Sequence, residues 1–109
     1  RSKGKPNGGA RLSAQDARRQ AAEARAALAP LKKGVAKAEA EIALLSKRIA
    51  EIDGHLADSG LYARDPARAQ ALARERGGLL RAREEAETAW LTASETYEEA
   101  EMRAREAAG

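Results

Sequence analysis

Apolar residues recur through the middle of the chain at alternating intervals of three and four positions. Nine positions form the series: Leu28, Leu31, Val35, Ala38, Ile42, Leu45, Ile49, Ile52 and Leu56. The mean spacing of 3.5 residues is the repeat of a coiled-coil seam, and it is sustained for about four heptads. We therefore predict a helix over residues 31–57, with a length of about 40 Å.

A second and weaker heptad pattern follows and predicts a helix over residues 66–106. Its apolar members are Ala69, Leu72, Leu79, Ala86, Trp90, Ala93, Tyr97, Ala100 and Ala104. The same repeat assigns Arg76 and Arg83 to the interface, which costs stability unless their charged heads reach out of it. Gly77-Gly78 interrupts the pattern, and we expect bending or fraying there because each glycine costs about 1 kcal/mol relative to alanine.

The segment between the two patterns contains the signals of a turn. An Asp-Ser-Gly run that finishes at Gly60 is expected to end the first helix, with Gly60 in the left-handed conformation. Asp65 and Pro66 are a suitable N-cap and first helical residue for the second helix. Leu61 and Tyr62 lie between these signals, and we expect both to plug the end of the helix pair, although Tyr62 could instead stack on DNA.

One short connection between two heptad helices makes them antiparallel neighbours. Folding about residue 61 pairs positions whose numbers sum to about 121, so that Leu31 meets Trp90. We expect Trp90 to be buried in this contact in preference to stacking on a base. Because an antiparallel hairpin satisfies its own seam, we expect the chain to be a monomer.

A shorter helix is predicted ahead of the hairpin, over residues 13–29. Ser13 is its expected N-cap, and Asp16 at the third helical position completes a weak capping box. Pro30 lacks a backbone donor and should end or kink this helix. Residues 1–11 are rich in Gly, Pro, Asn and Lys, a composition that predicts a flexible basic linker.

The composition favours long helices over a compact core. Of the 47 hydrophobic residues 28 are alanine, and phenylalanine is absent. Without cysteine, and with His55 as the one histidine, the chain offers no thiolate nucleophile and no Cys-based metal site. No apolar run reaches the length of a membrane helix, about 18 residues. We predict an all-α protein: an antiparallel two-helix coiled-coil hairpin preceded by a shorter helix, forming a domain over residues 12–109, with a disordered basic N-terminal linker.

Charge is distributed unevenly along the chain. Residues 1–37 carry ten Lys and Arg against two carboxylates, whereas residues 84–101 carry seven Glu and no Lys or Arg. Folding back places the acidic stretch beside residues 18–37, where the two partly neutralise each other. The basic surface that remains could attract a polyanion, although basic residues on a coiled coil are more often a solvated flank.

Four features between Leu28 and Trp90 carry a family resemblance. They are Leu28-Ala29-Pro30, the heptad start Ala38-Glu39-Ala40-Glu41-Ile42, the turn Leu61-Tyr62-Ala63-Arg64-Asp65-Pro66 and Trp90 itself. Together they resemble the C-terminal domain of the ABC-F ATPases of the Uup type, over about 60 of the 109 residues. Gly77-Gly78 departs from that pattern, since the family has helix formers there.

The resemblance implies a non-catalytic, DNA-binding tail of a cytoplasmic ABC transporter ATP-binding protein. ATP and Mg would be bound by the cassettes of the parent protein. The phosphate loop GxxxxGK[ST] is absent from this chain, so we expect no ATP hydrolysis and no cofactor here.

We expect contacts with DNA phosphates that do not depend on base sequence, with branched DNA among the candidate ligands. The expected contact residues are Lys3, Lys5, Arg11, Arg18, Arg19, Lys32, Lys33, Lys47, Arg48, Arg68 and Arg74. The alternative is a protein–protein or ribosome-docking hairpin of the same ATPase. Neither alternative involves a membrane.

Overall fold

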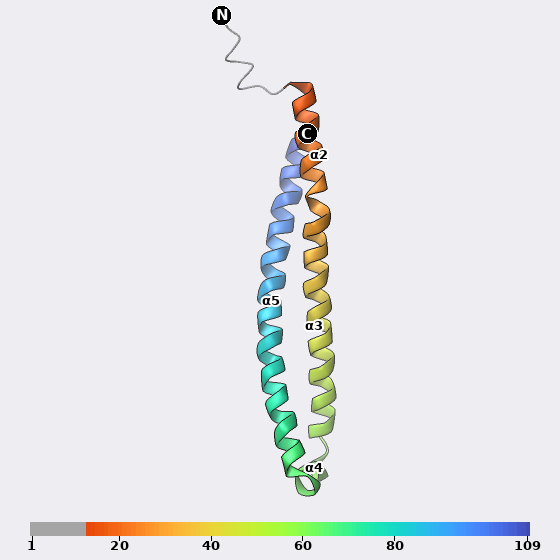
Figure 1. Cartoon of the computed structure of the whole chain (residues 1–109), viewed down its shortest axis with the longest axis vertical. Helices are drawn as coiled ribbons and strands as arrows, with labels where there is room; N and C mark the ends of the chain where they lie inside the picture. Colours follow the sequence, from red (N-terminus) through yellow and green to blue (C-terminus); the bar gives the residue numbers. More distant parts are fainter. Residues whose placement is uncertain (1–12) are drawn as a thin grey trace, which may run out of the picture. The chain divides into compact units, whose positions relative to one another are not determined.

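The computed structural model describes residues 13–109, and every secondary-structure element in that range is a helix. In chain order these are α2 (Ala14–Ala26), α3 (Leu28–Leu56), α4 (Ser59–Arg64) and α5 (Pro66–Ala108) (Figure 1). The predicted all-α hairpin with a shorter preceding helix is confirmed. The predicted linker at residues 1–11 lies outside the described residues.

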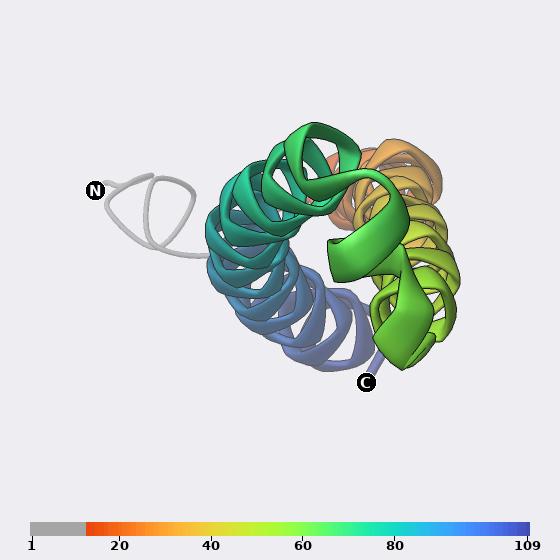
Figure 2. The same cartoon turned by 90° about the horizontal axis from the view of Figure 1, so that it is seen from below.

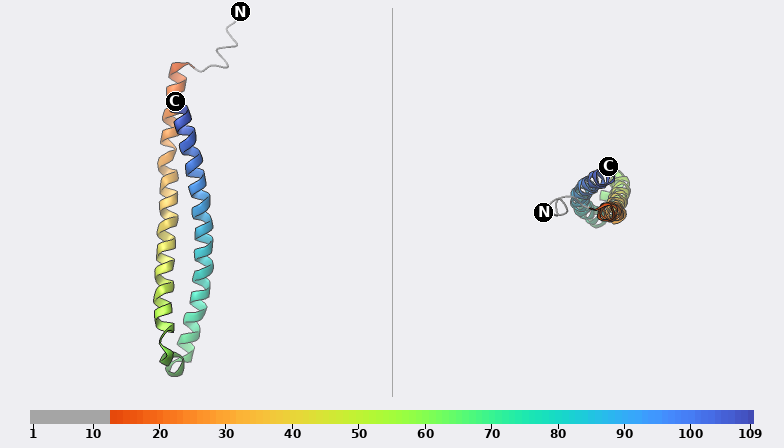
Figure 3. Two further views of the ribbon diagram at one scale, coloured as in Figure 1. Left: turned by 180° about the vertical axis from the view of Figure 1, so that it is seen from behind. Right: turned by 90° about the horizontal axis from the view of Figure 1, so that it is seen from above.

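The chain divides into two compact units, of which the hairpin unit is Gly34–Ala93. In this unit α3 and α5 run side by side and α4 joins them at the closed end (Figures 1 and 3). Glu39, near the start of α3, accepts a hydrogen bond from Trp90 in the second half of α5. Asp53, near the end of α3, accepts one from Arg76, which comes earlier in α5. The two helices are therefore antiparallel.

The heptad seams account for burial along both long helices. All nine predicted positions of α3 are buried or half-buried, and so are all predicted positions of α5. Arg76 and Arg83 occupy the α5 seam as predicted, and both are half-buried. Arg76 Nε donates to Asp53 Oδ1 at 2.5 Å, and Arg83 Nη1 donates to Ser46 Oγ at 3.3 Å. Their charged heads thus leave the apolar seam and find partners on α3.

The best-packed part of the hairpin lies at its closed end. Ile52, Leu61, Ala69 and Leu72 form a buried cluster against which Leu56 and Leu79 also pack. Ile52 is completely buried. Because burial of one Leu or Ile side chain contributes about 1.5–3 kcal/mol, this cluster is the main apolar anchor of the turn.

The turn contains a helix, α4, that was not predicted. Asp58 acts as its N-cap, since its Oδ1 accepts the Gly60 N–H at 2.9 Å, and Arg64 bonds the other carboxylate oxygen. Gly60 lies inside α4, so the prediction of a left-handed helix end there was wrong. Figure 2 shows α4 crossing the end of the hairpin between α3 and α5.

The two residues expected to plug the turn behave differently. Leu61 is buried in the closed-end cluster, as predicted. Tyr62 is 51% exposed, so its predicted plugging role was wrong. Neighbouring residues of a short helix point in different directions, and α4 has one apolar face to bury.

The alignment of the two long helices differs from the predicted one by about a heptad. Three hydrogen-bonded pairs have residue numbers that sum to 129: Glu39–Trp90, Ser46–Arg83 and Asp53–Arg76. Trp90 therefore meets Glu39 instead of Leu31, and it is half-buried instead of buried. A heptad pattern is satisfied again after a slide of seven residues, so the connection decides the alignment.

Two further boundaries correct the sequence reading. Pro30 lies in the first turn of α3, which begins at Leu28, and α2 ends at Ala26. A proline is tolerated there because the first N–H groups of a helix have no intrahelical partner. Gly77-Gly78 does not interrupt α5, which continues from Pro66 to Ala108. The packing of the flanking seam residues on α3 outweighs the modest helix cost of glycine.

The other unit combines α2 and the start of α3 with residues 94–109. Ser13 caps α2 as predicted, because its Oγ accepts the Asp16 N–H at 3.0 Å. The Asp16 carboxylate pairs with Arg19 at 2.6 Å. Ala17 and Ala21 of α2 line a hollow together with Ala107 and Ala108 of α5, and Ala21 is buried. Figure 3 shows α2 beside the end of α5.

Candidate nucleic-acid interface

The positive net charge of the chain resides in its first residues. All 17 carboxylates fall within residues 13–109, together with 16 of the 20 Lys and Arg. Arg1, Lys3, Lys5 and Arg11 supply the remaining four cations. A polyanion could therefore be held only by the N-terminal residues or by a local basic region.

The hairpin unit contains such a local region at its closed end. Residues 44–83, which include the turn, carry eight Lys and Arg against five carboxylates. The open end of the same unit, residues 34–43 and 84–93, carries one Lys against five Glu. The hairpin is therefore polarised along its length, with its positive charge near α4.

Every carboxylate of the closed end is already engaged. Arg48 bonds Glu75 through two contacts, Nε–Oε2 at 2.8 Å and Nη2–Oε1 at 2.9 Å, and reaches Glu51 at 3.4 Å. Asp53 pairs with Arg76, and Asp58 pairs with Arg64 at 2.9 Å. Asp65 accepts the backbone N–H of Arg68 at 3.1 Å and so caps α5, as the sequence predicted.

These contacts shift the pKa of the groups involved. The hydrogen bonds from Arg48 lower the pKa of Glu75, and the charges of Arg48 and Arg68 lower it further. The hydrogen bonds that Arg48 donates to Glu75 and Glu51 raise the pKa of Arg48. The bond from Arg64 lowers the pKa of Asp58, helped by the Gly60 N–H. These shifts favour the charged forms, so the pairs remain ionised at neutral pH.

Five cations of the closed end have no ion-pair partner among residues 13–109: half-buried Arg83, which donates to the Ser46 hydroxyl, and four others. The four others are Lys47, Arg68, Arg74 and Arg81, and all four are exposed. Arg74 and Arg81 are one heptad apart and share the outer face of α5, about 10 Å from each other along the helix. Arg81 was not among the predicted contact residues, although the heptad position it shares with Arg74 would have identified it.

The structure does not gather the predicted hairpin residues on one face. Lys47 occupies the outward heptad position of α3, and Arg74 the corresponding position of α5, so the two face away from the seam on different helices. Arg48 bonds Glu75, and the charge of Arg68 also lowers the pKa of Glu75. Arg48, one of the predicted contact residues, is already paired with Glu75 and Glu51.

The remaining predicted contact residues lie outside the hairpin unit. Arg18, Arg19, Lys32 and Lys33 are exposed on α2 and the start of α3, and Arg19 is paired with Asp16. Lys3, Lys5 and Arg11 lie outside the described residues.

Residues 13–109 contain no group of three or more acidic or imidazole side chains placed to hold a metal ion. None of the described helices combines the length and the apolar character needed to cross a bilayer.

In comparisons with known proteins, no family model, no curated protein and no solved structure matches this chain.

Proposed function

We propose that the chain is a non-catalytic, DNA-binding coiled-coil tail of a cytoplasmic ABC-F type ATPase. It holds the DNA backbone without reading base sequence. The contacts come from the basic N-terminal residues together with the closed end of the hairpin.

The observation that supports DNA binding most directly is the set of unpaired cations at the closed end. Since all five carboxylates of residues 44–83 are engaged, Lys47, Arg68, Arg74 and Arg81 are available to phosphates. Exposed guanidinium groups suit phosphate oxygens because their planar donors can form two parallel hydrogen bonds.

The ABC-F assignment rests on the resemblance around the turn and on local geometry that fits it. In the Leu-Tyr-x-x-Asp-Pro motif, Leu61 is buried at the turn, and Asp65 and Pro66 start α5. Each of these residues has a structural task in a helical hairpin. A tail of this kind would leave ATP and Mg to the cassettes of the parent protein.

Charge reversal with a matched control tests the DNA-binding surface. The double variant Arg74→Glu and Arg81→Glu should weaken binding to labelled duplex and forked DNA. It should also make the slope of log K against log salt concentration less negative by roughly two. The control is Arg103→Glu with Arg105→Glu, which makes the same charge change at exposed positions of α5 outside the closed end.

Equal weakening by both double variants would show that only net charge matters, and would remove the closed end from the proposed interface. If the unaltered chain binds no DNA at low salt, the DNA-binding proposal fails. Ribosomal RNA is included as a third ligand, and a clear preference for it would favour ribosome docking.

A further inference from the structure

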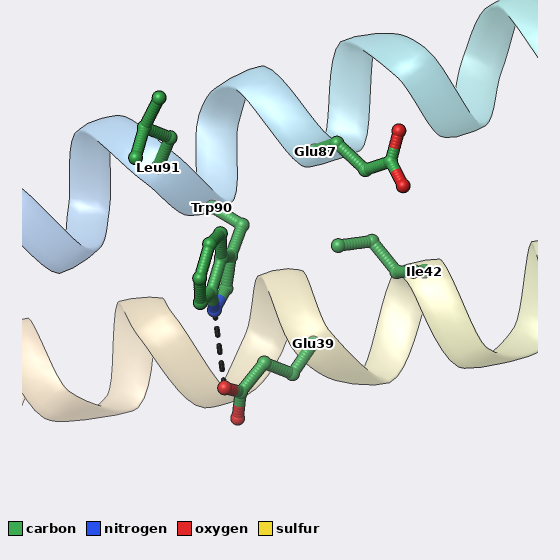
Figure 4. Close-up of a pocket in the computed structure, with 5 residues that line it drawn as sticks. All are labelled: Glu39, Ile42, Glu87, Trp90 and Leu91. Atoms are coloured by element: carbon green, nitrogen blue, oxygen red, sulfur yellow. Dashed lines mark hydrogen bonds between the residues drawn. The ribbon is translucent and has the colours of Figure 1, made fainter.

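An open groove lies on the hairpin unit at the opposite end from the unpaired cations. It is lined by Glu39 and Ile42 of α3 and by Glu87, Trp90 and Leu91 of α5, and its volume is about 490 Å³. Figure 4 shows the indole of Trp90 extending from α5 toward α3, where its Nε1 donates to Glu39 Oε2 at 3.0 Å. Trp90 is half-buried and Leu91 is 52% exposed, so apolar surface remains open.

The rim of this groove is acidic and lacks a compensating charge. Glu39 accepts the Trp90 N–H, and neither Glu39 nor Glu87 forms an ion pair within residues 13–109. Of the Lys and Arg within residues 13–109, none lines the groove. The groove thus presents an aromatic ring and an exposed leucine together with two carboxylates that form no ion pair within residues 13–109, a combination that disfavours a polyanion.

We propose that the groove binds a short peptide segment of a partner protein in which arginine alternates with leucine-like residues. The arginine stem lies along the Trp90 ring, where its guanidinium gains a cation–π contact and donates two hydrogen bonds to the Glu87 carboxylate. The neighbouring apolar residue of the peptide covers Leu91. This site goes beyond the proposed DNA binding, because it uses other residues and takes a ligand of opposite charge.

Trp90 is the one tryptophan of the chain, so its fluorescence reports on the groove directly. The full chain is titrated at low salt with acetyl-ALRALR-amide, and in parallel with the same peptide carrying citrulline in place of arginine. We expect a saturable change in Trp90 emission with the arginine peptide, and much weaker binding of the citrulline peptide, which has the same shape without the charge.

Substitutions then locate the site. Glu87→Gln should weaken binding of the arginine peptide about threefold to fivefold, the range expected for an exposed ion pair. Leu91→Ser should also weaken it, and circular dichroism checks that both variants remain helical. Glu98→Gln is the matched control, since it removes the same charge from an exposed position of α5 that does not line the groove.

Several results would overturn the proposal. They are the absence of any emission change, equal binding of both peptides, or an equal effect of Glu87→Gln and Glu98→Gln. An emission shift on deletion of residues 1–11 without peptide would mean that the chain's own basic segment occupies the groove. A change in Trp90 emission that depends on protein concentration, together with a sedimentation mass near twice 11.6 kDa, would mean that a second copy of the chain occupies the groove.

Discussion

Arg48 of α3 and Glu75 of α5 form a two-point ion pair across the hairpin, although 27 positions separate them in the chain. Both side chains are about two-fifths exposed, so the pair is screened by solvent and salt. Its planar geometry nevertheless demands one arrangement of guanidinium and carboxylate. We infer that this contact contributes more to the alignment of the two helices than to the stability of the fold.

The pair makes a prediction about pH. Because Arg48 lowers the pKa of Glu75 in the folded chain, the stabilisation by Glu75 is present above its unfolded pKa, about 4.3. It is lost as the pH falls through the lower folded pKa. Carboxyl NMR titration should therefore give Glu75 a midpoint below the ordinary range, and Arg48→Gln should raise that midpoint.

Arg64→Gln is the control for this titration, since it should raise the pKa of Asp58 and leave that of Glu75 unchanged. A Glu75 midpoint that does not respond to Arg48→Gln would contradict the pair as described.

Truncation of two adjacent residues of α4 should affect stability to very different extents. Leu61→Ala should lower the free energy of unfolding by about 2–5 kcal/mol, because Leu61 is buried against Ile52 and Leu72. Tyr62→Ala should change it by less than about 0.5 kcal/mol, since Tyr62 is half exposed. Urea denaturation followed by circular dichroism measures both, and similar losses for the two variants would refute the arrangement of α4.

The N-cap of α5 offers a third test of the turn. Asp65→Ala removes the acceptor of the Arg68 N–H and should destabilise the hairpin by about 0.5–2 kcal/mol. Asp65→Ser keeps a capping oxygen and should recover most of that loss. If thermal melts show that alanine and serine are equivalent at this position, the capping role of Asp65 is wrong.

The sequence was sufficient to predict which residues pack between the helices. The 3.5-residue repeat identified the buried positions of α3 and α5, even where Arg76 and Arg83 stand in the seam. It worked because a heptad pattern depends on the helix alone, and each position is buried whichever partner position it faces.

Alignment could not be predicted in the same way, because a slide of one heptad satisfies the pattern equally well. The choice depends on α4, whose N-cap Asp58 was interpreted as part of a helix stop. An aspartate before Ser59 and Gly60 can either end one helix or cap the start of another. The burial of Leu61 against Ile52 and Leu72 favours the second arrangement, in which Asp58 caps α4. The position of Trp90 against Glu39 follows from that choice.

The candidate DNA interface was only partly predictable for a related reason. Exposed basic residues are recognisable in sequence, but their partners are not, because pairs such as Arg48–Glu75 depend on the alignment. The structure therefore distinguishes Arg48, which is paired, from Arg74 and Arg81, which form no ion pair within residues 13–109.

The salt dependence of DNA binding tests the central claim most directly. Fluorescence anisotropy with a labelled duplex is measured over a range of salt for the full chain and for a variant lacking residues 1–11. The deletion removes Arg1, Lys3, Lys5 and Arg11, which changes the net charge from +3 to −1 and leaves the described helices complete. We expect the full chain to bind with micromolar or weaker affinity at physiological salt. The deletion should weaken binding and make the slope of log K against log salt concentration less negative by up to about 3.6. Absence of binding at low salt, or an unchanged slope after the deletion, would contradict this account.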